Sequence, residues 1–298
     1  MTRRLLAASA VATLALTGCA QGRAGTPIPD GDDAAAYVSA KFTDTLEKLH
    51  DDFQAMKPRK STMNESFLIN GEGIDSTIET VQAGKPIGEL VRNHSNKDLN
   101  DFIDNLYPAG TTTKYSLLGP MYASLAPTPW VGLPSSATTG EFGACSTGTY
   151  IVACKMLNAV VRATKDDRAA RSAKRTEDGS VIIEVDLTLR RFVEFKIEVF
   201  SDEIIGKFTD EMMNTPIATR VEVSPQQTMR SIGMTGTFAG KSRSGKDVRI
   251  DIQYDYRITE GATEKDLPPI PDASQVTMLP DEAAVADFNR RKDEIQGR

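Results

Sequence analysis

The sequence predicts an α+β fold built on one antiparallel sheet, and two alternating segments carry this prediction. At residues 181–189 every second residue is aliphatic, and most of the residues between them are charged or polar. Residues 248–258 alternate in the same way. Strands with one apolar face and one wet face are typical of antiparallel sheets. Residues 150–164 carry apolar side chains every three or four positions, which predicts a helix that can cover the apolar face.

The first nineteen residues have the pattern of a bacterial export signal that ends at a lipid-attachment site. Arg3 and Arg4 precede an apolar run over residues 5–16, which is shorter than the ~20 residues that a membrane-spanning helix needs. The run ends in Leu-Thr-Gly-Cys at residues 16–19, which resembles a lipobox. We expect residues 1–18 to be removed and acylated Cys19 to hold the protein on the outer face of the cell membrane. The arginine pair leaves Sec or Tat export open.

Charge and motif content exclude several functions. The formal net charge of −6 becomes −8 once the two arginines of the signal are removed. An acidic exported protein is a poor candidate for binding nucleic acid. The chain has no nucleophile-elbow, zinc-protease or phosphate-loop motif, and its two histidines, His50 and His94, do not neighbour a cysteine. We therefore expect neither an enzyme nor a metal site, and no cofactor.

The two remaining cysteines, Cys145 and Cys154, lie in an exported chain, where disulfides persist. Nine residues of continuous helix would separate their Cα atoms by ~13.5 Å, whereas a disulfide needs less than ~7 Å. A bond therefore requires the chain to turn between them, and residues 146–148 offer a turn. The sequence leaves two alternatives, a disulfide or two buried thiols.

In the N-terminal half, Gly and Pro mark residues 19–31 as a linker behind the anchor. An apolar stripe then predicts a helix that Asp33 caps. The spacing of apolar residues and breakers predicts the helix at 33–56, strands at 61–71 and 74–81, and a short amphipathic helix at 96–107.

In the C-terminal half, the pattern predicts a solvated loop, one capped helix, a strand meander and a tail. The tail contains a polar helix, and solvent is its default location, with closure of a cavity or contact with a partner as alternatives. The segments are the loop at 165–179, the helix at 201–214, strands at 217–223, 232–238 and 248–258, and the tail helix at 281–296.

One segment resembles a known family. Gly119, Tyr122 and Leu125, followed by Trp130 and Gly132, are similar to the paired Gly-x-x-Tyr-x-x-Leu and Trp-x-x-x-Gly strands of mycobacterial and actinobacterial lipid-carrier lipoproteins of the LppX and LprG kind, although the closing glycine comes earlier here. The later order of strand, short helix, proline and long strands is similar to the C-terminal half of that family. We accordingly assign a lipid-binding domain to residues 32–260 and a C-terminal extension to 261–298.

The resemblance implies a LolA-like half-barrel, in which one curved antiparallel sheet carries helices on its concave face. Between sheet and helices such a fold holds acyl chains in an apolar cavity, where each buried CH₂ contributes ~0.8 kcal/mol. The candidate cavity residues are Phe67, Ile69, Tyr122, Leu125, Val181, Ile183, Val185, Leu187, Leu189, Ile204, Phe208, Met212, Val221, Ile232, Met234, Val248, Ile250 and Ile252.

The resulting expectation is a lipid-anchored protein of the cell envelope that binds an acylated lipid or glycolipid and transfers or presents it. The alternative is an anchored scaffold whose core is filled by its own side chains and which binds another envelope protein. The two alternatives differ in one structural feature, because only the first needs an opening beside the apolar face of the sheet.

Overall fold

The computed structural model describes residues 44–52, 55, 57–134, 145, 148–165 and 171–297. All of them belong to one compact unit, Ser39–Arg298. The expected export signal, Cys19 and the linker lie outside the described residues. No helix in the described part of the chain is both long enough and apolar enough to cross a membrane.

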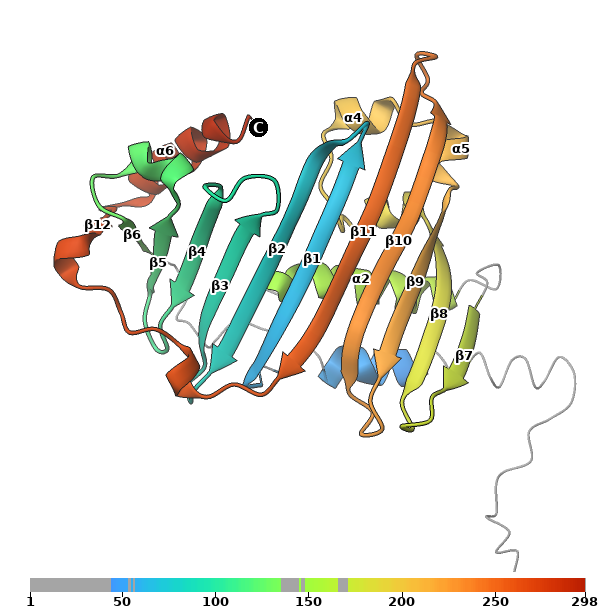
Figure 1. Cartoon of the computed structure of the whole chain (residues 1–298), viewed down its shortest axis with the longest axis horizontal. Helices are drawn as coiled ribbons and strands as arrows, with labels where there is room; N and C mark the ends of the chain where they lie inside the picture. Colours follow the sequence, from blue (N-terminus) through green and yellow to red (C-terminus); the bar gives the residue numbers. More distant parts are fainter. Residues whose placement is uncertain are drawn as a thin grey trace, which may run out of the picture. The chain divides into compact units, whose positions relative to one another are not determined.

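One open sheet of twelve strands forms the frame of this unit, as Figure 1 shows. Its strands are β1 (Arg59–Ile69), β2 (Glu72–Ala83), β3 (Gly88–Ser95), β4 (Phe102–Tyr107), β5 (Thr113–Leu118), β6 (Trp130–Pro134), β7 (Arg171–Arg175), β8 (Val181–Thr188), β9 (Pro216–Val223), β10 (Met229–Lys241), β11 (Asp247–Glu260) and β12 (Val276–Met278). Across the sheet they follow the order β12-β6-β5-β4-β3-β2-β1-β11-β10-β9-β8-β7. Neighbouring strands are antiparallel except β12 and β6, which are parallel.

The helices are short apart from two, and residues 44–52 are also helical. They are α2 (Gly148–Thr164), α3 (Leu189–Glu194), α4 (Asp202–Gly206), α5 (Asp210–Met213) and α6 (Glu282–Ile295), with 3₁₀ turns η1 (Pro120–Leu125), η3 (Glu264–Asp266) and η4 (Ala273–Gln275). Figure 1 shows α2 crossing behind the middle strands. The predicted α+β class is confirmed, and the open curved sheet with helices on one face is the half-barrel that the resemblance implies.

The pairing of β1 with β11 joins the two halves of the sheet. In this register Phe67 lies opposite Ile252 and Met63 lies opposite Tyr256. Because side chains that face each other across strands point to the same side of a sheet, the apolar stripes of both halves merge into one surface. Buried side chains of α2, including Met156 and Leu157, pack on that surface and form the main core with it.

Three segments differ from the sequence prediction. Residues 96–107 were expected to be helical, but they contain strand β4, because β3 and β5 pair with it on both sides. The expected loop at 165–179 contains edge strand β7. The single helix expected at 201–214 is two short helices, which Ser201 and Thr209 cap separately by accepting bonds from backbone N–H groups.

The C-terminal tail is docked on the sheet, so its default placement in solvent was wrong. After β11 the chain reaches β6 and adds β12 beside it as the edge strand, where Val276 lies opposite Trp130. A Cβ atom on Gly132 would meet the sulfur of Met278, so any other residue here would make the Met278 side chain shift. The tail helix α6 begins close to the expected residue and then packs on η1.

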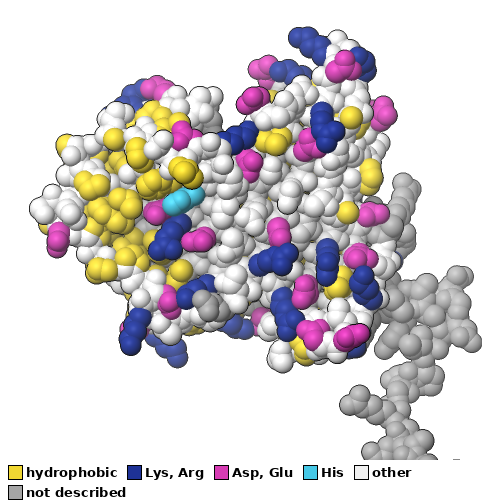
Figure 2. Space-filling view, viewed as in Figure 1, with side chains coloured by type: hydrophobic (Ala, Val, Ile, Leu, Met, Phe, Trp, Pro, Cys, Tyr) yellow, Lys and Arg dark blue, Asp and Glu magenta, His cyan; other side chains and the backbone are white. Residues whose placement is uncertain are grey.

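The face of the sheet opposite α2 is unequal along its width. Figure 2 shows hydrophobic side chains gathered over β4, β5 and β6, whereas charged side chains are scattered over the other half. Val81, Leu90 and Leu106 are buried in a small cluster on this face, and Leu267 of the tail packs against it. The tail therefore shields apolar surface as it passes β2, β3 and β4.

Candidate ligand-binding cleft

The structure places the predicted cavity residues mainly in a packed interior. Tyr122 and Leu125 belong to a second cluster beneath α6, and Ile69, Val181, Ile204 and Val248 are half-buried at the margin of the main core. In that core each buried side chain is at most a few per cent exposed and is surrounded by other side chains of the sheet, α2, α3 and α5. Its members from the predicted set are Phe67, Ile183, Val185, Leu187, Leu189, Phe208, Met212, Val221, Ile232, Met234, Ile250 and Ile252.

Cys145 and Cys154 form a disulfide whose Cα atoms are 5.7 Å apart. Cys154 is buried in the second turn of α2, and Cys145 lies just before the helix. Gly148 begins α2 with a φ of +50°, a left-handed conformation that favours glycine. The bond therefore ties Cys145 to the helix that fills the core.

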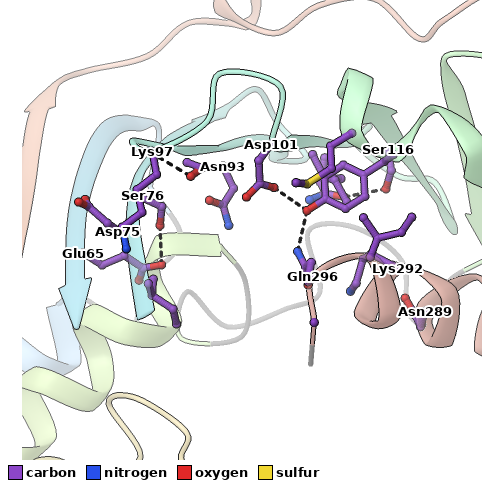
Figure 3. A pocket seen from close by; sticks show the side chains of 18 of the residues that line it. Glu65, Asp75, Ser76, Asn93, Lys97, Asp101, Ser116, Asn289, Lys292 and Gln296 are labelled. Carbon is purple, nitrogen blue, oxygen red and sulfur yellow. Dashed lines mark hydrogen bonds between the residues drawn. The ribbon is translucent and has the colours of Figure 1, made fainter. Parts of the chain in front are cut away.

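A large opening lies elsewhere among the described residues, on the helix side of β2, β3, β4 and β5. It is a cleft of about 800 Å³, which α6 and η1 border on one side and Ile204 of α4 borders on the other. Figure 3 shows side chains from the sheet and from α6 converging on it. Ligand pockets usually enclose ~300–1,000 Å³, so the cleft has the size of a small-molecule site.

The floor of the cleft is a row of polar side chains on neighbouring strands. Ser76, Asn93, Asn105 and Ser116 come from β2, β3, β4 and β5 and point to the side on which α2 lies. The hydroxyl of Ser116 donates a 2.7 Å hydrogen bond to Oδ1 of Asn105, which lies directly opposite it. The floor can thus hydrogen-bond a polar group, although the same face is apolar farther along the sheet.

The wall formed by α6 is apolar around Phe288 and polar at the C-terminal end of the helix. Phe288 of α6 is 3% exposed and packs in the hydrophobic cluster between the helix and the sheet. Ile295 packs against the same cluster. Near the end of the wall the hydroxyl of Tyr122 donates a 2.5 Å hydrogen bond to Asp101 and accepts a 2.9 Å bond from Nε2 of Gln296. These bonds fix the C-terminal end of α6 against η1.

The acidic groups of the cleft have partners in the protein. Glu65 accepts a 2.9 Å hydrogen bond from Ser76, and Asp75 accepts a 2.7 Å bond from Asn96. Lys97 donates to two backbone carbonyl oxygens in the β1–β2 turn. Among the described residues, no group of three or more His, Cys, Asp and Glu side chains could hold a metal ion.

Two lysines approach each other beside α6. Lys114 of β5 and Lys292 of α6 both line the cleft. Burial, and next the charge of Lys292, lower the pKa of Lys114 below its usual value. The described residues offer Lys114 neither a hydrogen bond nor an ion pair, and Lys292 has a loose pair with Asp293, at 3.5 Å.

Two of the cleft residues, Tyr122 and Ile204, were predicted from the sequence as cavity residues, and the others were not. The signal for the floor was the interrupted alternation of residues 93–116, where Asn and Ser occupy positions that an ordinary core strand fills with apolar side chains. The lysines carried no local signal, because Lys292 reaches the cleft only through the docking of the tail.

No protein-family model and no curated protein sequence matches the chain. Among solved structures, the chain is similar to LprF from Mycobacterium bovis, with 10% sequence identity and a TM-score of 0.38, over 78% of this chain and 97% of that one. It is also similar to a domain assigned to outer membrane lipoprotein sorting in Vibrio parahaemolyticus, with 8% identity and a TM-score of 0.21, over 76% of this chain and 96% of that one. Both superpositions are loose.

Proposed function

We propose that this chain is an exported lipoprotein, held on the outer face of the cell membrane by acylated Cys19, that binds an acylated lipid or glycolipid and transfers or presents it. The observation that carries the binding proposal is the cleft of about 800 Å³ between the sheet and α6. The pattern of residues 1–19 supports the anchoring, and the open α+β sheet with helices on one face supports a carrier fold.

The lining of the cleft suits a ligand that is itself polar at one part and apolar at another. Ile74 and Ile103 contribute apolar surface from the sheet, and Phe288 and Ile295 contribute it from α6. Amide and hydroxyl groups occupy the floor between them. Apolar atoms gain free energy by leaving water, while polar groups that leave water need hydrogen-bond partners. An amphipathic molecule meets both conditions.

The packed core favours a second candidate, an anchored scaffold that binds another envelope protein. Twelve of the eighteen predicted cavity residues are buried in the main core, where α2 occupies the space that acyl chains would take. A scaffold needs no opening there. The two candidates therefore differ in whether the purified protein carries lipid.

Organic extraction followed by mass spectrometry tests the first candidate. The full chain with Cys19→Ser, which lacks the expected acyl acceptor, should release a bound acylated molecule when it is purified after export. Asn105→Trp places a large ring on the floor of the cleft and should abolish recovery. Thr235→Trp places the same ring on an exposed position of β10 and should leave recovery unchanged. A chain that folds but releases no lipid would falsify the carrier proposal and favour the scaffold.

The anchoring has a separate test. Wild-type protein should fractionate with membranes, and Cys19→Ser should move it to the soluble fraction. An unchanged membrane fraction for Cys19→Ser would contradict anchoring through this residue.

A further inference from the structure

We infer that the end of the cleft beside α6 binds an anionic group, a phosphate or a carboxylate, through Lys114 and Lys292. The inference rests on the proposed function, because it assigns the charged part of the ligand to one end of the same cleft. It adds a chemical class that neither the fold nor the export signal indicates.

The first reason is the placement of Lys114. It lies on the helix side of β5, directly opposite the buried Leu133 of β6, and its side chain is only partly exposed. Within the part of the chain that the structure describes, it has no hydrogen bond and no ion pair. A cation that leaves water without a counter-charge costs free energy. The protein would recover this cost when an anion enters the cleft.

The second reason is that the neighbouring charge has the same sign. Lys292 reaches the cleft from α6 and contributes to lowering the pKa of Lys114. Its own pair with Asp293 is long, at 3.5 Å, and Asp293 follows it directly in the chain. Two ammonium groups that repel each other in the empty cleft would both attract one anion placed between them. Charge-assisted hydrogen bonds of this kind are roughly twice as strong as neutral ones.

Neutral donors lie on the same part of the lining. The hydroxyl of Ser116 donates its hydrogen bond to Oδ1 of Asn105. The amide N–H groups of Asn105 therefore have no partner among the described residues. Asn289 lies one turn before Lys292 on α6 and also lines the cleft, as Figure 3 shows. Phosphate and carboxylate oxygens accept several hydrogen bonds at once, which matches a set of two cations and two amides.

The acidic side chains do not compete for the same end of the cleft. Glu65 and Asp75 are bound to Ser76 and Asn96, beside the turn that joins β1 and β2. Asp101 accepts the hydrogen bond of Tyr122. Figure 3 shows Glu65 and Asp75 on the opposite side of the cleft from Lys292. The ligand's charge would therefore lie toward α6, and its apolar part would lie against Ile74 and Ile103.

Calorimetric titration with three probes tests this inference on the full chain with Cys19→Ser. The probes are octyl phosphate, octyl glucoside and inorganic phosphate. The variants are Lys114→Gln and Lys292→Gln, and the matched control is Lys174→Gln, which removes one charge from the exposed edge strand β7. Octyl phosphate should bind, each cleft variant should weaken it by about tenfold or more, and the control should bind like wild type.

The outcomes separate the inference from the function on which it rests. If both octyl probes bind equally well and the lysine variants change neither, the anion site is overturned while the cleft proposal stands. If inorganic phosphate binds as tightly as octyl phosphate and depends on both lysines, the anion site stands and the source is a free anion, so the lipid proposal falls. If none of the three probes binds, both are overturned.

Discussion

The side-chain amide of Gln296 donates a 2.9 Å hydrogen bond to the hydroxyl of Tyr122, which lies 174 residues earlier in the chain. Arg291 adds a 3.3 Å bond to the backbone carbonyl of Leu125. Both bonds join the last helix to the 3₁₀ turn between β5 and β6. The cleft therefore has this wall because the C-terminal extension is docked, and undocking the extension would open the cleft on that side.

Phe288→Ala should undock α6. Phe288 is the buried residue of this helix, and replacing a buried Phe by Ala typically costs ~3–5 kcal/mol. Hydrogen exchange should become faster in α6 and in η1, and octyl phosphate binding should be lost. Arg290→Ala is the control on the same helix, since its ion pairs are exposed and contribute little. Unchanged protection of η1 in Phe288→Ala would show that the helix does not depend on this contact.

Leu157→Ala tests whether the core under α2 is a filled interior. Leu157 is fully buried, so its truncation should lower the free energy of unfolding by about 2–5 kcal/mol in denaturant titrations. Asn158→Ala, at the next and exposed position of α2, should change it by less than about 0.5 kcal/mol. A small loss for Leu157→Ala would indicate that the side chain has space around it, as a ligand cavity requires.

Lys114→Met should stabilise the ligand-free protein. The folded state lowers the pKa of Lys114, so the unfolded state binds more protons between that lowered pKa and the usual value of 10.5. The stability of the wild type should therefore rise as the pH rises through this window, and the variant should lack this rise. Denaturant titrations at several pH values, with Lys174→Met as control, measure the difference. A less stable variant at neutral pH would contradict the assignment of an uncompensated charge.

Acid should loosen the tail near η3. Hydrogen bonds from Lys60, at 2.8 Å, and from Thr263 hold the pKa of Asp266 at about 2, below its usual 3.8. A lowered pKa in the folded state means that the carboxylate stabilises the docked tail above about pH 4 and loses this effect as the pH falls toward 2. Trp130, the single tryptophan, pairs with β12 and reports the docking by fluorescence. Asp266→Asn should lack this transition, and an identical transition in that variant would assign it to another group.

Removing the disulfide should destabilise the protein. For a closed loop of nine residues, the chain-entropy relation gives about 2.5 kcal/mol. Cys145→Ala is the milder replacement, since Cys154 is the more buried partner. Thermal or denaturant unfolding of Cys145→Ala should match that of reduced wild-type protein. A variant as stable as the oxidised wild type would show that the bond constrains little.

Much of the sheet could be predicted because its strands follow one rule, apolar toward α2 and polar toward water. β8 keeps this rule from Ile183 to Leu187, and its boundaries were predicted closely. α2 was predicted for the same reason, since its apolar positions repeat with the helical period. In both cases burial against the main core dictates every second or every third to fourth side chain.

Strand β4 shows where that rule stops. Its two faces are both mixed, with Asp104 and Leu106 on one side and Ile103 and Asn105 on the other. One face meets the small cluster below the tail and the other forms the floor of the cleft, so neither face is uniformly apolar. The apolar residues that remain have a spacing that fits a helix. A segment that serves a binding site thus departs from the pattern on which sequence reasoning depends.

The docked tail could not be predicted from its own residues. α6 buries Phe288 and little else, and β12 is only three residues long. Their stability comes from partners far away in the chain, above all Trp130 and Tyr122. The residues of the tail do not indicate which distant residues they contact. The lysine pair of the cleft could not be predicted for the same reason, because Lys292 belongs to the tail.

The two edge strands of the sheet also affect whether copies of this protein can associate. An edge strand has unpaired backbone N–H and C=O groups, which can pair with a strand of another molecule. Here one edge strand is β12, which is three residues long, and the other is β7, where Arg171, Lys174 and Arg175 bring positive charge. When two copies meet, β12 is too short to extend the sheet and the like charges of two β7 strands repel each other, so this architecture resists growing into fibrils.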